Sequence, residues 1–315
     1  MGASEAALIE RILARTATRG GVRVGIGDDA AVLDGDPPVV VAHDMLVQDV
    51  HFRWSTARPE DVGHRALAVN LSDLAAMGAR PRAALVGLGI PPGAGAMALV
   101  DGIYAGMEEL AATTGCSVVG GDLSRAPVTV LGVTVLGHMP EGLAPVLRSG
   151  AVVGDAVCVT GAVGGSAAGL ALLEDPALTA GQRSAAVRAH LRPWPRLDEG
   201  TALARAGVHA MMDCSDGLAI DLRRLAVASG VRVVLDLERV PLGPAVTEVF
   251  PAPREAAVAG GEDYELIVAL PPGRTVPGVT LHPVGRVVAG PPGLEVMCGG
   301  TPVPLARLGW DHDLA

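Results

Sequence analysis

The sequence predicts a protein of mixed α and β structure in two parts, and three observations carry this prediction. First, 315 residues suffice for two ordinary domains. Second, half of the residues are apolar, so a sizeable core can be buried, although only 2% are aromatic. Third, strand-like and helix-like segments follow one another along the chain, with a plausible linker at residues 140–145.

The first half mixes strands and helices. Ser4 can cap a first helix with apolar residues at 8, 9, 12 and 13. A β-branched run at 39–42 predicts a strand that ends in His43-Asp44, and Pro59 suits the first turn of a helix that runs to about Met77. Further segments predict strands at 83–90, 116–119 and 128–138, and a helix at 96–113.

The second half reads as an α/β unit with glycine-rich turns. Its predicted strands are 156–160, 210–213, 231–237, 264–270, 281–288 and 294–297. Helices are expected at 166–173, 182–190, 195–206 and 216–228, the last capped by Ser215. The glycine-rich segment 161–165 is more often a tight turn than a phosphate cradle.

Composition excludes several functions. All 24 basic residues are arginine, so a Walker A loop, a kinase site built on a strand lysine and Schiff-base chemistry are excluded. The net charge of −10 argues against a nucleic acid or an anionic membrane as partner. The long uncharged stretches are broken by Gly and Pro, which predicts no membrane span. No signal peptide is visible and the four cysteines are far apart, so we expect a cytoplasmic protein.

Acidic residues recur beside glycines and after predicted strands. They are Asp28, Asp29, Asp44, Asp122, Asp213, Asp216, Glu262 and Asp263, and Asp73 lies within an otherwise apolar helix. Each alone has an ordinary explanation, such as a turn or a helix-start charge. Together they predict a magnesium site with room for more than one ion, because magnesium prefers carboxylates, water and phosphate oxygens. Such a site suits the charge of a transferring γ-phosphoryl group of ATP.

These segments resemble the thiamine-monophosphate kinase family, within the aminoimidazole-ribonucleotide synthetase superfamily. The matching segments keep their order nearly throughout the chain, and two are specific to this kinase: the helix motif at 68–79 and Gly-Gly-Glu-Asp-Tyr-Glu-Leu at 260–266. The resemblance implies an α+β protein. Its N-terminal ferredoxin-like domain (1–139) would dimerise into a barrel, and a C-terminal α/β domain (146–315) would complete the active site. The implied reaction is direct in-line transfer from ATP to thiamine monophosphate, giving thiamine diphosphate.

The resemblance also implies a role for each matching position. It implies Mg²⁺ ligands at Asp29, Asp44, Asp73, Asp122, Asp213 and Asp216. It implies ATP contacts at Tyr104, Gly121, Asp122, Arg148 and Ser215, and thiamine monophosphate contacts at His51, Glu262 and Trp310. An arginine fork can neutralise phosphate charge, and a tryptophan face can receive a thiazolium cation. No residue need act as a strong base, because the acceptor is already an anion.

One position departs from the family pattern. Family members usually carry threonines around the aspartate at position 44, whereas this chain reads His43-Asp44-Met45. Because magnesium prefers oxygen to imidazole nitrogen, we do not expect His43 to be a ligand.

Two other classes of function remain open. One is another ATP-dependent enzyme of the same superfamily. A selenophosphate-forming enzyme would be expected to show an N-terminal reactive Cys or Sec and a nearby Lys, and neither is present. The other is a non-catalytic protein that binds nucleotide and metal, which the loss of aspartates would support, yet all six positions are filled. A purely structural dimer gives no reason for acids beside glycines.

Overall fold

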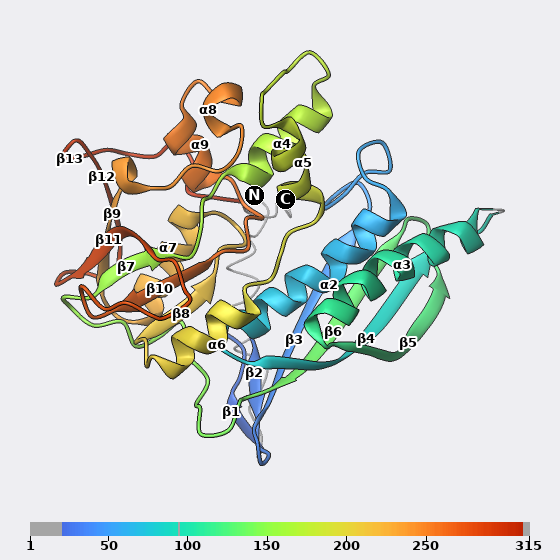
Figure 1. Cartoon of the computed structure of the whole chain (residues 1–315), viewed down its shortest axis with the longest axis horizontal. Helices are drawn as coiled ribbons and strands as arrows, with labels where there is room; N and C mark the ends of the chain where they lie inside the picture. Colours follow the sequence, from blue (N-terminus) through green and yellow to red (C-terminus); the bar gives the residue numbers. More distant parts are fainter. Residues whose placement is uncertain (1–20, 94, 311–315) are drawn as a thin grey trace, which may run out of the picture.

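The computed structural model describes residues 21–93 and 95–310, which form two sheets flanked by helices (Figure 1). The first sheet has the strand order β1-β2-β3-β6-β4-β5. The second has the order β13-β12-β9-β11-β7-β10-β8. The chain thus has the mixed α and β architecture that the sequence predicts.

The first sheet is built from residues 22–138. Its elements are β1 (Val22–Val24), β2 (Ala31–Leu33), β3 (Val39–Val47), α2 (Pro59–Ala76), β4 (Arg80–Ile90), α3 (Ala96–Thr114), β5 (Ser117–Arg125) and β6 (Val130–His138). β6 pairs antiparallel with β3 and β4, and β5 pairs parallel with β4. The helices α2 and α3 cover one face of this sheet (Figure 1), and among the described residues no helix covers the other.

The second sheet is nearly all antiparallel, with one parallel pair between β9 and β12. Its half of the chain contains β7 (Ala156–Val159), α4 (Gly165–Glu174), α5 (Arg183–Leu191), α6 (Leu197–Arg205), β8 (Ala210–Asp213), α7 (Leu218–Ala228), β9 (Arg232–Asp236), η1 (Leu237–Arg239), α8 (Val246–Val249), α9 (Pro253–Ala259), β10 (Leu266–Leu270), β11 (His282–Val288), β12 (Gly293–Cys298) and β13 (Thr301–Pro302). All five residues of β10 are buried, as expected for an apolar central strand.

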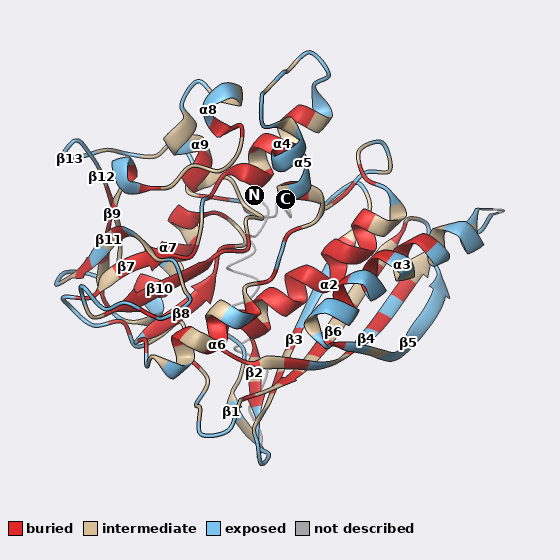
Figure 2. Cartoon of the chain, viewed as in Figure 1, coloured by how far each residue is buried: buried red, intermediate tan, exposed pale blue. Residues whose placement is uncertain are grey.

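Helix α2 joins the two halves. Fifteen of its 18 residues are buried, so it is covered all round rather than on one stripe (Figure 2). Its leucines share one core with residues of the second sheet, including Met211 and Leu266. A polar side chain on α2 is therefore held between the sheets rather than in solvent.

Two strands run further than the sequence predicts. We expected strands to end at Asp44 and near Val119, but β3 continues to Val47 and β5 to Arg125. The extra residues stay paired with β6 and β4, so both Asp44 and Asp122 lie inside strands. The short elements β1, β2, α8, α9 and β13 were not predicted. The helix expected after Ser4 lies outside the described residues.

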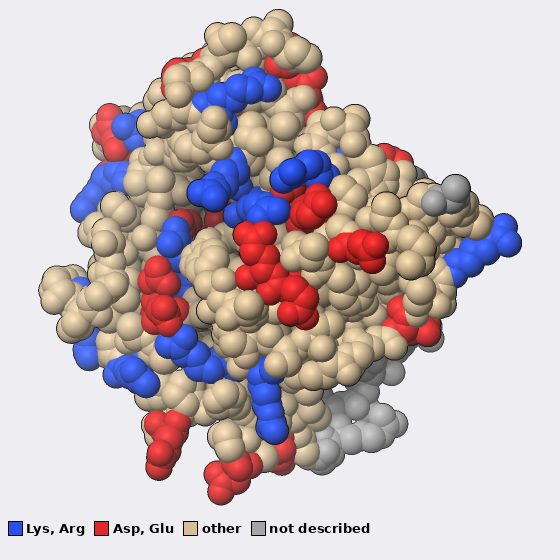
Figure 3. All heavy atoms as spheres, turned by 45° about the vertical axis from the view of Figure 1, so that its right-hand side comes forward, with Lys and Arg blue, Asp and Glu red and all other residues tan. Residues whose placement is uncertain are grey.

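Arginines and acids are intermixed on the surface, as the face drawn in Figure 3 shows. Some of these pairs join the two halves: Arg192 lies 2.7 Å from Asp61, and Arg80 lies 2.6 Å from Asp198. Within the described residues, no helix combines the length and apolar character that a membrane span requires.

Candidate active site

Three of the predicted metal ligands meet between the two halves of the chain. Asp29 lies just before β2, Asp73 on α2 and Asp213 at the end of β8. Each offers a carboxylate oxygen, and these three oxygens lie within 4.8 Å of one another. The set consists of oxygen donors only, which is the donor type that magnesium prefers.

These carboxylates carry more negative charge than their surroundings neutralise. Burial, aided by the neighbouring aspartates, raises the pKa of both Asp29 and Asp73 well above the usual value. Burial also raises the pKa of Asp213 to about 6. One buried oxygen of Asp29, Oδ2, has no hydrogen-bond partner among the described residues. A bound cation would satisfy that oxygen and reverse all three shifts.

Arg148 is the cation that the chain itself supplies here. Its Nη2 donates to Asp29 Oδ1 at 2.6 Å, and its backbone amide donates to both carboxylate oxygens of Asp28 at 3.2 and 3.3 Å. The two acids hold the pKa of Arg148 above its usual value despite its burial. The side chain therefore lies beside the acid cluster, where an incoming phosphate group could also meet it.

The polar residues of the helix motif each have a structural partner. Asn70 Oδ1 accepts the backbone N–H of Asp44 at 2.8 Å, and Ser72 Oγ donates to Asp213 Oδ2 at 2.7 Å. Asp73, one residue further, reaches the cluster itself. Asp73 does not project from α2 into bulk solvent, because its carboxylate lies with those of Asp29 and Asp213.

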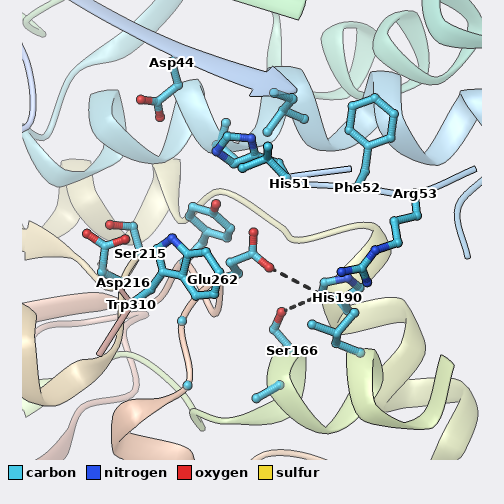
Figure 4. A pocket seen from close by; sticks show the side chains of 18 of the residues that line it. Asp44, His51, Phe52, Arg53, Ser166, His190, Ser215, Asp216, Glu262 and Trp310 are labelled. Carbon is cyan, nitrogen blue, oxygen red and sulfur yellow. Dashed lines mark hydrogen bonds and ion pairs between the residues drawn. The ribbon is translucent and has the colours of Figure 1, made fainter. Parts of the chain in front are cut away.

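A cavity of about 560 Å³ opens next to this cluster. Figure 4 shows its lining, which includes Asp44, His51, Phe52, Arg53, Ser166, His190, Ser215, Asp216, Glu262 and Trp310. The cavity thus brings together six predicted residues of three kinds. Asp44 and Asp216 are predicted metal ligands, Ser215 is a predicted ATP contact, and the predicted acceptor set is His51, Glu262 and Trp310.

Two loops form the floor of the cavity and bind each other. The backbone amide of Glu262 donates to the Ser215 carbonyl oxygen at 2.6 Å. The backbone amide of Tyr264 donates to the Cys214 carbonyl oxygen at 2.9 Å. Gly261 permits this approach, since a Cβ there would lie 2.6 Å from the Ser215 carbonyl oxygen. The predicted helix cap at Ser215 is wrong: α7 begins at Leu218, and its Ncap is Gly217.

The loop that carries Ser215 and Asp216 is held by a buried acid that the sequence did not single out. One oxygen of Asp221 accepts the amides of residues 215, 216 and 217 at 3.1 to 3.2 Å. Arg224 forms ion pairs with both Asp216 and Asp221. The side chain of Asp216 is thereby oriented from behind.

Trp310 already has a cation over its ring. The guanidinium carbon of Arg307 lies 5.3 Å from the ring centroid. The backbone amide of Trp310 donates to the Asp216 carbonyl at 2.8 Å, which ties this residue to the metal-ligand loop. His51 is fixed in turn from β3, because its Nδ1 accepts the amide of Val47 at 3.1 Å.

Asp122 lies elsewhere within this single chain. It lines an open groove with His43, Gly121 and Gly132 on the first sheet. Neighbouring residues of a strand point to opposite faces, so His43 and Asp44 face opposite sides of the sheet. Within one chain, the predicted ligands Asp44 and Asp122 are thus on opposite faces. The Mg²⁺ role of Asp122 stays a prediction.

The remaining predicted ATP contacts have a structural explanation of their own. A Cβ at Gly121 would lie 1.9 Å from the Val86 carbonyl oxygen, so close strand packing demands glycine there. Tyr104, on α3, packs against the N-terminal core and lines neither hollow.

The glycine-rich segment 161–165 connects β7 to α4, and Val163 in its middle forms a bridge to Leu242. Asp263 accepts the amides of Gly164 and Ser166 at 2.6 and 3.2 Å, so an acid of the chain occupies the start of α4. Sequence reasoning also missed Arg65, Ser166 and His190. The only signal was that Arg65 and Ser166 lie in apolar helical stretches, where a polar residue needs a partner.

Comparison with known proteins decides the family. Residues 27–139 match the model of the AIR synthase related protein N-terminal domain, and residues 152–276 match that of its C-terminal domain. A thiamine-monophosphate kinase of Mycobacterium tuberculosis is 42% identical over 305 residues, which covers 91% of this chain and 86% of the relative. The chain belongs to the thiamine-monophosphate kinase family. The Escherichia coli K12 member is 36% identical over 330 residues, with 99% of both chains covered.

Solved structures of the kinase family have the same fold. The structure described as AaThiL complexed with AMPPCP and TMP superposes with a TM-score of 0.87 at 33% identity, covering 98% of this chain and 97% of that one. The hydrogenase maturation protein HypE, at 20% identity and a TM-score of 0.69, shares the fold alone.

Proposed function

We propose that this protein transfers the γ-phosphoryl group of ATP to thiamine monophosphate, producing thiamine diphosphate and ADP. The observation that carries the proposal is the match, over 98% of the chain, to a kinase described as complexed with AMPPCP and TMP. The acid cluster and the adjoining cavity would supply a site for each substrate class. A phosphate oxygen of the acceptor would attack the γ-phosphorus in line, and the bond to the β–γ bridging oxygen would break as ADP leaves.

The residues fit magnesium as the metal. Asp29, Asp73 and Asp213 would hold it, since their oxygens converge and one of them has no partner. Asp44 and Asp216 border the same space and would hold further ions, with Asp122 as the remaining predicted ligand. Magnesium ions, when bound, would neutralise the charge of the triphosphate.

The other residues would bind and orient the substrates. Arg148, beside Asp29, would meet the phosphates together with Ser215, while Tyr104 and Gly121 remain predicted ATP contacts. His51, Glu262 and Trp310 would surround the thiamine moiety. Because the acceptor is already ionised, positioning and charge neutralisation would supply the catalysis.

We further propose a cytoplasmic homodimer with domains at 1–139 and 146–315. The face of the first sheet that no described helix covers supports pairing into a barrel, because Met45 and Leu85 expose about half of their surface there. All four cysteines are free, as a reducing compartment would keep them.

A purified-enzyme assay tests the function. We expect thiamine diphosphate to form only with ATP, magnesium and thiamine monophosphate together, and a chelator to abolish the reaction. Turnover confined to other phosphorylated acceptors would reject the substrate and favour another enzyme of the superfamily. Nucleotide binding without any turnover would favour the non-catalytic alternative.

A further inference from the structure

Beneath the cavity lies a buried cation that the proposed mechanism does not use. Arg65, on α2, has a side chain only 3% exposed, and it forms an ion pair with Glu262 Oε1. Nη2 makes this contact as an ion pair, and neither Nη2 nor Nε has a hydrogen-bond partner among the described residues. Arg65 does not line the cavity, whereas Glu262 does and is 30% exposed. The cation therefore acts from behind the acid.

The two partners of this ion pair are not equivalent. Burial lowers the pKa of Arg65, and the nearby Tyr264 counteracts this only in part. A buried guanidinium has few alternatives to its carboxylate, while a partly exposed carboxylate could turn to water. Arg65 thus fixes the place of Glu262 rather than the reverse.

The second oxygen of Glu262 is constrained as well. Oε2 lies 3.5 Å from His190 Nδ1, and the same nitrogen lies 3.0 Å from Ser166 Oγ (Figure 4). Burial and Arg65 lower the pKa of His190 to about 3, so this imidazole is neutral and adds no second cation. The backbone of Glu262 has φ +68°, a left-handed conformation that is uncommon for residues other than glycine.

We propose that Arg65 is a positioning residue for the acceptor substrate, because it holds Glu262 Oε1 and leaves Oε2, beside the neutral His190, for contact with the substrate. This inference rests on the proposed function. It changes the role of Glu262: the acid is neutralised by its own arginine and recognises the acceptor through one oriented oxygen. The thiamine moiety would then be bound by placed hydrogen-bond and ion contacts rather than by a free negative charge.

Steady-state kinetics with Arg65→Met, Arg65→Lys, Glu262→Gln and the double variant Arg65→Met/Glu262→Gln test the proposal. Arg65→Met should raise KM for thiamine monophosphate about tenfold and change KM for ATP by less than about twofold. Arg65→Lys should rescue part of the loss, since it keeps the charge without the fork. The double variant should be little worse than Glu262→Gln, because the pair acts as a unit.

Arg192→Met is the matched control. Arg192 also joins the two halves through Asp61 and Glu109, but it lies outside the cavity lining, so neither KM should move. Unchanged KM for thiamine monophosphate in a folded Arg65→Met enzyme overturns the inference, as do equal effects on both substrates or fully additive losses. If Arg65→Met does not fold, Arg65→Lys decides by the same criteria. An inactive wild type overturns the proposed function itself.

Discussion

At the scale of single residues, the site holds buried carboxylates so close together that their ionised forms are unfavourable without a bound cation. Asp29, Asp73 and Asp213 lie within 4.8 Å of one another with Arg148 as their adjoining cation. Without metal, burial and the repulsion between neighbouring carboxylates destabilise their ionised forms, and the pKa of each acid is therefore raised. Residues selected for binding cations are therefore expected to weaken the metal-free fold.

Asp73→Asn should separate activity from stability. Loss of a predicted ligand should lower kcat about 100-fold or more. The metal-free variant should nevertheless unfold at a higher denaturant concentration than the wild type, because one buried charge is gone. Turnover assays and urea unfolding with chelator measure the two effects. Asp198→Asn, at an exposed ion pair with Arg80, is the control and should change neither strongly. Near-normal turnover of Asp73→Asn would remove it from the site.

Asp263 predicts a pH dependence of stability. Burial raises its pKa from 3.8 to about 7. Between these two pKa values the folded state holds a proton that the unfolded state has lost. The free energy of unfolding therefore falls as pH rises through this range, by at most about 1.4 kcal/mol per pH unit. Asp263→Asn removes this contribution. Urea unfolding at about pH 5 and about pH 8, with chelator, should show a flatter dependence in the variant. Equal slopes would contradict the assignment.

At the scale of elements, α2 is the part on which both halves depend. It presents Asn70 to β3, Ser72 to Asp213 and Asp73 to the acid cluster. It also crosses α3 so closely that two glycines are required: a Cβ at Gly63 would lie 1.8 Å from the Ile103 carbonyl oxygen, and one at Gly106 equally close to that of Glu60. The position of the ligands on α2 thus depends on this crossing.

Gly106→Ala should therefore destabilise the protein although alanine favours helices. The propensity gain is at most about 1 kcal/mol, whereas forcing the helices apart costs more. A net loss of about 2 kcal/mol is expected, measured by urea unfolding. Gly93→Ala, where the added Cβ would meet nothing within 4 Å, is the matched control. A variant as stable as the wild type would show that the helices can separate at no cost.

What the sequence could predict depended on how local the signal was. The predicted bounds of the long elements α2, α3 and β6 nearly match the structure, with Pro59 marking the start of α2 and alternation marking β6. The cluster was predicted from acids that recur in glycine turns, at strand ends and inside an apolar helix, because a carboxylate in an apolar stretch needs a partner or a metal. Arg65 was not predicted because its partner, Glu262, lies far along the chain. Asp221 was not predicted because its contacts depend on how the loop before α7 folds. Strand ends at Asp44 and Asp122 were misjudged because pairing, not polarity, ends a strand.

At the scale of the whole molecule, no helix of the described residues covers one face of the first sheet. On the first sheet α2 and α3 pack against one face, while the other carries a groove lined by Met45, Leu85, Gly132 and the predicted ligand Asp122. An apolar face with many small residues suits a second copy of the same sheet. It is also the face on which Asp122 is separated from Asp44, so the predicted set of six ligands is incomplete within one chain.

Leu85→Glu should test whether this face pairs. Leu85 is 43% exposed and lines the groove, so a carboxylate there would have to be buried without a partner when two sheets meet. Sedimentation should find the wild type dimeric and the variant monomeric at micromolar concentration. Activity should fall with the dimer, because Asp122 lies in the surface that pairing would close. Val227→Glu, at an exposed apolar site on α7, should leave both unchanged. A wild type that is monomeric and fully active would show that the groove serves no partner copy and that Asp122 is not needed in the metal site.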